Sequence, residues 1–250
     1  MNTEKAINEL NNKLIKIQKM GWIENKFKGN GAIGLTFEKL IGKEIENFEI
    51  PDYEGIEIKT KLKTSHPYIR LFSAVPDGYL FEIKRIHEQY GFMNGQNLKV
   101  FCLSIVANKI VCIKNRYYFK LKVDKNRKKI FLKILDKFSG TIDENVSWSF
   151  ELLTEKIERK LTYLAIITGE QKKCNQKKFF KYNKINFYKL KHPDIFIKLI
   201  ELGYIKISFN ITEKYNVNGE KKIYDHGTSF SISKHNLIKL FNQINFISLK

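Results

Sequence analysis

Apolar positions follow a helical period at the start of the chain and a period of two further on. Residues 4–20 predict an amphipathic helix, because apolar side chains recur at helical spacing, at Ile7, Leu10, Leu14, Ile15 and Ile17. A second helix is predicted over about 33–46 by the same argument. Apolar and charged residues then alternate over 56–63, which predicts a strand, and residues 68–74 are expected to form its neighbour.

The remainder of the chain is rich in short apolar runs. Several runs between residues 98 and 137 are separated by turn residues, which predicts an antiparallel meander. The elements expected after it are a helix capped by Ser147 and ending near Lys160, a strand over 161–168, a helix from Pro193 to Leu202, strands near 204–213 and 221–232, a short helix from about Lys234 and a last strand. The pattern therefore predicts a mixed α/β fold in which strands outnumber helices.

The composition is that of a folded, strongly cationic protein. Of the 250 residues, 43% are hydrophobic and 13% aromatic, which argues against disorder. The three cysteines form no CxxC pair, which argues against a disulfide scaffold or a zinc ribbon. The first residues lack the apolar core of a signal peptide, and no segment approaches the ~20 apolar residues of a membrane span. We therefore expect a soluble, cytoplasmic protein.

The formal net charge of +19 favours a polyanionic partner, because like charges repel one another in the folded state. Nucleic acid is the partner that this charge fits best. An AT-biased genome stays open as a cause of the charge, because such a bias would by itself raise the lysine content. A membrane surface would also attract cations, although the basic residues are spread over the chain and do not gather on one amphipathic segment.

One predicted strand carries side chains suited to phosphodiester hydrolysis. Residues two apart on a strand project from the same face, so Glu57 and Lys59 are expected side by side. Asp52 precedes a bend at Gly55, and this bend can bring the Asp52 carboxylate beside Glu57. Two carboxylates and a backbone carbonyl offer the hard oxygen ligands that suit Mg²⁺. Lys59 can orient or help deprotonate an attacking water and stabilise charge on a phosphate.

The same spacing occurs a second time, at Asp77, Glu82 and Lys84. There the apolar positions have helical spacing, and on a helix Glu82 and Lys84 would point about 200° apart and could not share a metal ion. The first copy is therefore the candidate site. A plainer interpretation of that copy also stays open, namely a solvated strand face on which lysines neutralise Glu57.

Segments on both sides of this strand form an ordered series. They are 31–42, Asn47, 51–52, 55–60 and 71–72, then 225–230, with weaker likeness at 147–150 and 160–167. The series resembles the MvaI/BcnI family of restriction endonucleases, which belongs to the PD-(D/E)xK nuclease superfamily and is structurally related to the MutH mismatch-repair nickase. The likeness extends over most of the chain and is strongest at 21–72 and 222–232.

The resemblance implies a mixed-sheet, MutH-like α/β fold with two intimate lobes in a single endonuclease over residues 1–250. Its catalytic lobe would be centred on about 1–75, and its DNA-recognition elements would include about 204–232. The protein would be a monomeric, Mg²⁺-dependent type II restriction endonuclease that clamps double-stranded DNA and cuts a short, CC/GG-flanked site one strand at a time. A cognate DNA methyltransferase would be its functional partner in the cell.

The resemblance also assigns roles to single residues. Asp52 and Glu57 match metal ligands, and Lys59 matches the catalytic lysine. Glu38 matches a helix carboxylate that lies near the metal site in MutH-like enzymes, although a solvated or capping carboxylate is its alternative role. The site that the resemblance implies therefore coincides with the one that the strand pattern indicates.

DNA-binding residues are expected in two regions. Before the second helix, the candidates for phosphate or minor-groove contact are Lys26, Lys28 and Asn30, and on the catalytic strand Lys61 is a candidate for holding the scissile strand. Simple solvation stays open as the alternative for each lysine. In the recognition region, the candidates for contact with base edges or phosphates are Ser208, Asn210, Asp225, His226 and Thr228.

Two features depart from the family. Relatives carry charged residues on the strand near 206–211, where this chain offers Ser208 and Asn210, so its target can differ. The region after Phe72 is also unlike theirs; Arg85 and His87 in it are candidates for DNA contact, although solvation at the surface is the preferred expectation for both. Two alternatives to a restriction enzyme stay open: a repair nickase, as MutH is, and a DNA-binding module that has lost its chemistry.

Overall fold

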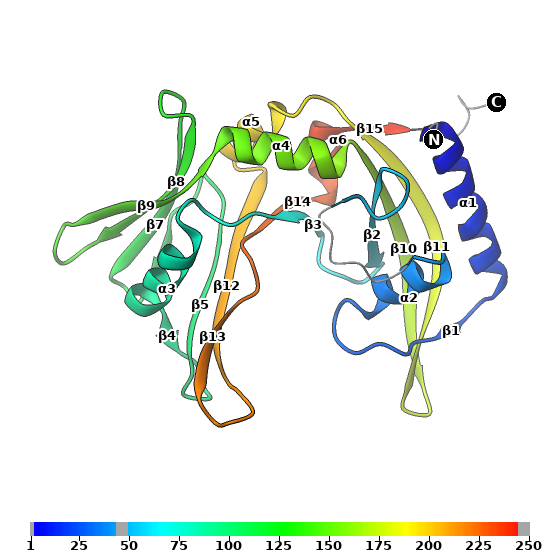
Figure 1. Cartoon of the computed structure of the whole chain (residues 1–250), viewed down its shortest axis with the longest axis horizontal. Helices are drawn as coiled ribbons and strands as arrows, with labels where there is room; N and C mark the ends of the chain where they lie inside the picture. Colours follow the sequence, from blue (N-terminus) through cyan, green and yellow to red (C-terminus); the bar gives the residue numbers. More distant parts are fainter. Residues whose placement is uncertain (1–2, 44–49, 245–250) are drawn as a thin grey trace. The chain divides into compact units, whose positions relative to one another are not determined.

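Segments far apart in the sequence combine into two units, which are described separately. The structure is a computed structural model that describes residues 3–43 and 50–244 (Figure 1). The first unit comprises residues 1–67, 156–191 and 241–250, and the second comprises residues 68–155 and 192–240. Each unit is therefore completed by segments that the sequence separates widely.

The first unit is a mixed sheet with helices against it. Its elements are α1 (Thr3–Lys19), β1 (Ile23–Glu24), α2 (Ala32–Leu40), β2 (Ile56–Leu62), the end of α4 (Phe150–Leu161), β10 (Tyr163–Cys174), β11 (Lys177–Leu190) and β15 (Phe241–Ile244). The strand order is β1-β11-β10-β2, and β15 pairs with β11. β10 runs parallel to β2 and antiparallel to β11. The strand that carries the candidate site is therefore at an edge of the sheet, as far as the chain is described.

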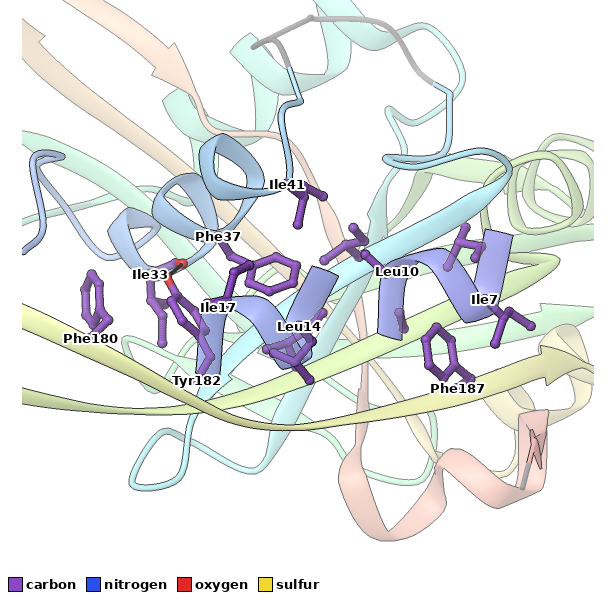
Figure 2. Packing of buried hydrophobic residues seen from close by; sticks show 14 of the residues in the cluster. Ile7, Leu10, Leu14, Ile17, Ile33, Phe37, Ile41, Phe180, Tyr182 and Phe187 are labelled. Atoms are coloured by element: carbon purple, nitrogen blue, oxygen red, sulfur yellow. Dashed lines mark hydrogen bonds between the residues drawn. The ribbon is translucent and has the colours of Figure 1, made fainter. Parts of the chain in front are cut away.

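The core of the first unit lies between α1, α2 and one face of this sheet (Figure 2). The apolar stripe of α1 is buried at Ile7, Leu10, Leu14 and Ile17, whereas Ile15 is 42% exposed and lies outside the stripe. From the sheet, the core residues include Ile56, Ile58, Ala165, Ile167, Phe180, Tyr182 and Phe187. Burying each large apolar side chain contributes about 1.5–3 kcal/mol, so this interface holds β2 firmly against the helices.

Two expectations about this region are wrong. α2 ends at Leu40, and Gly42 has a φ of +82°, so the helix does not run on to residue 46; residues 44–46 lie outside the described part. The strand β3 (Tyr68–Ser73) is not the neighbour of β2 but pairs with β14 (Ser229–Ser233) in the second unit. Strand pairing is decided by long-range burial, and β10 provides the partner that β2 needs.

The second unit contains two antiparallel sheets. Its elements are β3, α3 (Tyr79–Tyr90), β4 (Phe92–Met93), β5 (Lys99–Ile105), β6 (Val111–Ile113), β7 (Tyr117–Asp124), β8 (Lys129–Asp136), β9 (Ile142–Ser149), the start of α4, α5 (Ile195–Glu201), β12 (Ile205–Tyr215), β13 (Lys221–Asp225), β14, the 3₁₀ helix η1 (Lys234–Asn236) and α6 (Leu237–Leu240). One sheet has the order β3-β14-β12-β5-β4 with β13 on β12, and the other is the meander β6-β7-β8-β9. The predicted meander is confirmed for β6 to β8, whereas β5 belongs to the other sheet.

Aromatic side chains fill the core of the second unit. The ring of Trp148 lies 5.9 Å from that of Phe209 and 5.8 Å from that of Phe230, and its indole N–H donates to the carbonyl of Ala74 over 3.2 Å. Ser147 is a buried residue of β9 and not a helix cap. Ser149 has that role instead, because its Oγ accepts from the backbone N–H of Leu152 at the start of α4.

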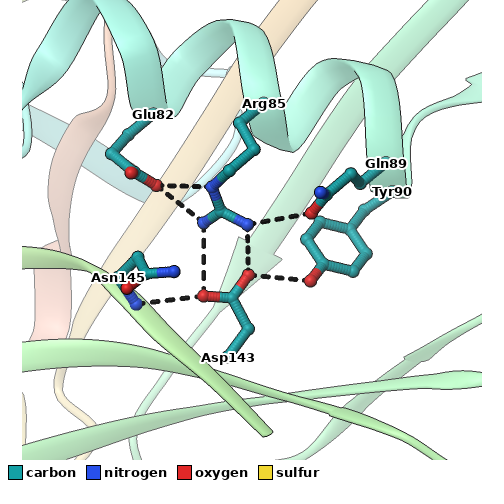
Figure 3. Close-up of polar contacts among 6 residues, drawn as sticks. All are labelled: Glu82, Arg85, Gln89, Tyr90, Asp143 and Asn145. Carbon is teal, nitrogen blue, oxygen red and sulfur yellow. Dashed lines mark hydrogen bonds and ion pairs between the residues drawn. The ribbon is translucent and has the colours of Figure 1, made fainter. Parts of the chain in front are cut away.

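Glu82 and Lys84 of the second copy of the acidic pattern lie on helix α3, as predicted, and Glu82 belongs to a group of polar contacts between α3 and β9 (Figure 3). Arg85 donates to Glu82 and to Asp143 of β9, and the hydroxyl of Tyr90 donates to Asp143 over 2.7 Å. The expectation that Arg85 and His87 are solvated is wrong. The side chain of Arg85 is 13% exposed, and His87 is buried with its Nε2 3.0 Å from the carbonyl oxygen of Lys99.

Candidate functional site

A tight turn places Asp52 beside the edge strand β2. The first and last residues of the turn 53–56 exchange two backbone hydrogen bonds, of 2.9 and 2.7 Å. Its central residues, Glu54 and Gly55, have φ values of +45° and +83°, as in the two-residue turns that connect adjacent antiparallel segments. The chain thereby returns on itself, and Oδ2 of Asp52 accepts the backbone N–H of Ile58 over 2.9 Å. The bend expected at Gly55 is therefore present.

Glu57 is buried on the strand next to this turn. Its side chain is 1% exposed, and its Oε1 accepts a hydrogen bond from Lys59 on the same strand and lies 3.7 Å from Nζ of Lys160 on α4. Its other oxygen, Oε2, is buried without a hydrogen-bond partner in the described part of the chain. Burial raises the pKa of Glu57 against the opposing charge of Lys59, and the negative charge of Asp52 raises it further.

Two further groups complete the polar environment. Oδ1 of Asp52 forms an ion pair with Lys43, which follows α2. Burial raises the pKa of Glu38 on α2, and the charge of Asp52 raises it further, while Lys43 and Lys59 oppose both. The fold therefore brings both Glu38 and Glu57 within electrostatic reach of Asp52, with lysines among them.

The donor set fits a hard divalent cation. Among residues 3–43 and 50–244 no group of three or more acidic, histidine or cysteine side chains is gathered in metal-binding geometry, and Asp52 and Glu57 each form an ion pair with a lysine. A buried carboxylate oxygen without a partner is costly, and the unpartnered Oε2 of Glu57 is such an atom. A cation that interacts with Asp52 and Glu57 would relieve that cost and take over the role of the lysines.

Sequence reasoning missed the two lysines at this site that come from outside the strand. Lys43 lies nine residues from Asp52, and Lys160 comes from a helix far along the chain. Neither has a local signal, because lysine is frequent throughout the sequence. Only the packing of α4 and the parallel pairing of β10 with β2 reveal the position of Lys160.

The DNA-binding candidates of the first unit are on its surface or near it. Lys26, Lys28 and Asn30 are exposed in the segment between β1 and α2. Asn25 shapes this segment by accepting the backbone N–H of Phe27 over 2.9 Å. Lys61, on the catalytic strand, donates to the carbonyl of His66. The three exposed residues are free of the core and accessible to a ligand.

The candidates on β12 lie on one polar face of a sheet. Ser208 and Asn210 alternate with buried apolar residues and project to the opposite face. The hydroxyl of Ser208 is 2.8 Å from that of Ser104 on β5, and Oδ1 of Asn210 accepts from the thiol of Cys102, also on β5, over 3.5 Å. At these two positions the face therefore offers small, neutral hydrogen-bonding groups, as expected from the sequence.

The link between β13 and β14 carries the remaining candidates. The backbone N–H of His226 donates to the carbonyl of Asn210 over 3.0 Å, so the link lies beside β12. Asp225 accepts the N–H of Gly227 over 2.9 Å and thereby stabilises the turn. Thr228, by contrast, is 1% exposed, and the structure does not place its side chain on the polar face.

Comparisons with known proteins identify the fold and the family. The model of the MvaI/BcnI restriction endonuclease family matches residues 11–241. A solved complex of restriction endonuclease MvaI with its cognate DNA substrate is similar at 30% identity and a TM-score of 0.85, over 95% of this chain and 96% of that chain. The same enzyme solved without DNA is similar at 28% identity and a TM-score of 0.59, over 96% of each chain. No curated protein sequence matches.

The fold expectation of a mixed α/β endonuclease is confirmed by these structures. In the described residues, no helix has the length and apolar character that crossing a membrane requires. The family match spans nearly the whole chain and includes the acidic strand and the polar sheet face. On this basis the chain belongs to the MvaI/BcnI restriction endonuclease family.

Proposed function

We propose that this type II restriction endonuclease hydrolyses double-stranded DNA with Mg²⁺ held by Asp52 and Glu57, and that it cuts the two strands of its specific site one after the other. The observation that carries the metal proposal is the buried Oε2 of Glu57, which has no hydrogen-bond partner in the described part of the chain. Hard carboxylate oxygens at a buried strand edge are the ligands that Mg²⁺ prefers.

The bound metal would polarise the scissile phosphate and lower the pKa of a water. The residues of the chain have separate roles. The turn at 53–56 positions Asp52, and the interface between β2 and the helices positions Glu57. Lys59 orients the attacking water and stabilises charge that develops on the phosphate. Glu38, whose pKa is raised by burial and by Asp52, is a third carboxylate available to the metal.

DNA is held mainly through its phosphates, which the net charge of +19 supports. We assign phosphate contact to Lys26, Lys28, Asn30 and Lys61, and contact with base edges to Ser208, Asn210, Asp225 and His226. The similarity to a complex of MvaI with its cognate DNA supports this assignment. The proposal includes a monomeric enzyme in the cytoplasm and a cognate DNA methyltransferase that protects the DNA of the host.

Digestion of unmethylated phage or plasmid DNA in the presence of Mg²⁺ tests the proposal. Discrete fragments are expected, and a smear or the absence of cutting on every unmethylated DNA would contradict it. With supercoiled plasmid, open circles should appear first and linear DNA afterwards. A product that stops at the open circle would instead indicate a nickase.

Variants test the assigned residues. Asp52→Asn and Lys59→Ala should each slow cleavage by roughly 100-fold or more while changing DNA affinity by only a small factor. The matched control is Lys84→Ala, because Lys84 has the same place in the second copy of the pattern and is 68% exposed on α3. The control should cut as the unmodified protein does. Normal cleavage by both site variants would show that the assignment is wrong.

A further inference from the structure

Four serines lie in a row across the polar face of the larger sheet in the second unit. The register pairs Ser104 of β5 with Ser208 of β12, Ser208 with Ser229 of β14, and Ser229 with Ser73 of β3. Residues that are directly paired project from the same face, so the four side chains form one line, here called the serine row. Ser104 is exposed, and the other three serines are partly exposed.

Arg70 lies at the β3 end of the serine row. Its guanidinium donates to the hydroxyl of Ser73 and has a second contact, of 3.5 Å, with the carbonyl of His226. Gly227 passes close over this pair, because a Cβ built on it would lie 3.4 Å from Cβ of Ser73 and 3.9 Å from a guanidinium nitrogen of Arg70. The guanidinium is therefore held in a defined orientation at the edge of the polar face.

Arg70 has neutral hydrogen-bond partners, whereas three other arginines form ion pairs with carboxylates. Arg85, Arg116 and Arg127 each bind one or more carboxylates. Arg70 donates to a hydroxyl and to a backbone carbonyl, both of which are neutral. Partial burial of the guanidinium lowers the pKa of Arg70 from its ordinary value, although the residue as a whole is exposed. With no carboxylate among these contacts, the exposed guanidinium keeps its charge and its remaining N–H groups available to acceptors of a ligand.

We propose that Arg70 determines sequence specificity by donating two hydrogen bonds to one guanine of the target in the major groove. This inference rests on the proposed cleavage of DNA at a specific site. An arginine fork matches the O6 and N7 acceptors of guanine, and this pairing is the commonest specific contact between proteins and DNA. The anchoring by Ser73 and the link 226–227 favours a base over a phosphate, because base readout needs a fixed direction.

Cleavage and binding with modified DNA test this role. In binding assays without a divalent cation, the unmodified protein should lose roughly 5- to 150-fold in affinity when 7-deazaguanine, which lacks N7, replaces one particular guanine of the site. Arg70→Ala, which loses both hydrogen bonds, should lose at least as large a factor on the natural site and become insensitive to that replacement. Arg70→Lys, which keeps the charge, should also discriminate less. Cleavage of the natural site should be fastest for the unmodified protein and slower for both Arg70 variants.

The control is Arg116→Ala, because Arg116 is an exposed arginine that already binds Asp136. It should retain the specificity of the unmodified protein. If Arg70→Ala weakened binding equally on every sequence and lowered the salt dependence, Arg70 would contact a phosphate and the inference would be overturned. Unchanged specificity in Arg70→Ala would overturn it as well. Failure of the unmodified protein to cut any DNA would instead count against the proposed function, because the binding assays need no cleavage.

Discussion

Lys160 of α4 lies 3.7 Å from Oε1 of Glu57 on β2, so the buried carboxylate contacts one lysine of its own strand and a second from a distant helix. Both positive charges oppose the rise in pKa that burial imposes on Glu57. The ionised form of Glu57, which a metal needs as a ligand, therefore depends on residues that lie far apart in the sequence.

The variant Lys160→Ala should move the acid limb of the pH–rate profile to higher pH. Removal of a positive charge raises the pKa of a neighbouring carboxyl, so a larger share of Glu57 is protonated at a given pH below the limb. The rate there should fall by up to roughly tenfold, and the rate at alkaline pH should change less. Profiles of the variant and of Lys84→Ala, as the control, give the measurement. An equal loss at every pH would contradict the prediction.

The variant Gly55→Ala should damage activity more than stability. Gly55 has a φ of +83°, and an alanine there is strained by about 1–2 kcal/mol although nothing lies within 4 Å of the added Cβ. The strained turn would also displace Asp52, and a misplacement of about 1 Å costs roughly 100-fold in rate. Chemical denaturation and single-turnover cleavage measure the two effects.

Gly140→Ala provides the matched control for this turn. Gly140 has a φ of +70° and the same open surroundings, and it belongs to the second unit, whereas Asp52 belongs to the first. It should lose a similar amount of stability and keep its activity. Gly55→Asn should recover part of the loss, because asparagine tolerates positive φ. If Gly55→Ala cuts as fast as the control Gly140→Ala, the turn does not position Asp52.

Mg²⁺ should raise the melting temperature of the protein, and Asp52→Asn should remove this effect. A ligand that binds only the folded state stabilises it by about 2.7 kcal/mol at 100 times its dissociation constant. Thermal unfolding over a Mg²⁺ titration gives the measurement, with NaCl at equal ionic strength to separate general screening. Equal Mg²⁺ stabilisation of the variant would show that Asp52 does not bind the metal.

The Arg85–Asp143 pair should contribute stability that disappears at low pH. Burial by itself would raise the pKa of Asp143, but hydrogen bonds from Arg85, the N–H of Asn145 and Tyr90 lower it below its ordinary value. A carboxyl with a depressed folded-state pKa contributes stability above its unfolded value of 3.8, and this stability is lost as the pH falls through the folded-state pKa.

Asp143→Asn should therefore destabilise the protein by about 1.5–3 kcal/mol at pH 7, because it removes charge-assisted hydrogen bonds from Arg85, which keeps Glu82 as its partner. The deficit should shrink as the pH falls below 3.8. Urea unfolding at several pH values measures it. A double-mutant cycle with Arg85→Met separates the pair from the packing of each side chain. A deficit that does not depend on pH would contradict the prediction.

The sequence by itself determined the elements whose signal is local. The alternation around Glu57 and Lys59 and the bend at Gly55 predicted one face with two acids and an amine, because strand and turn geometry depend on neighbouring residues. Helical spacing likewise excluded Glu82 and Lys84, which lie on α3. The side-chain directions on β2 and α3 could be predicted because a strand repeats every 2 residues and a helix every 3.6, and both periods are intrinsic to the backbone.

Only the tertiary structure decided which distant groups meet. It paired β2 with β10 rather than β3, brought Lys160 to Glu57, buried Thr228 and placed the carbonyl of His226 against Arg70. The sequence contains many lysines and many carboxylates, so it does not distinguish a lysine that binds a carboxylate from a lysine that is solvated. The environment of each lysine depends on the burial and pairing of elements far apart in the chain. Short-range sequence patterns carry no information about that pairing.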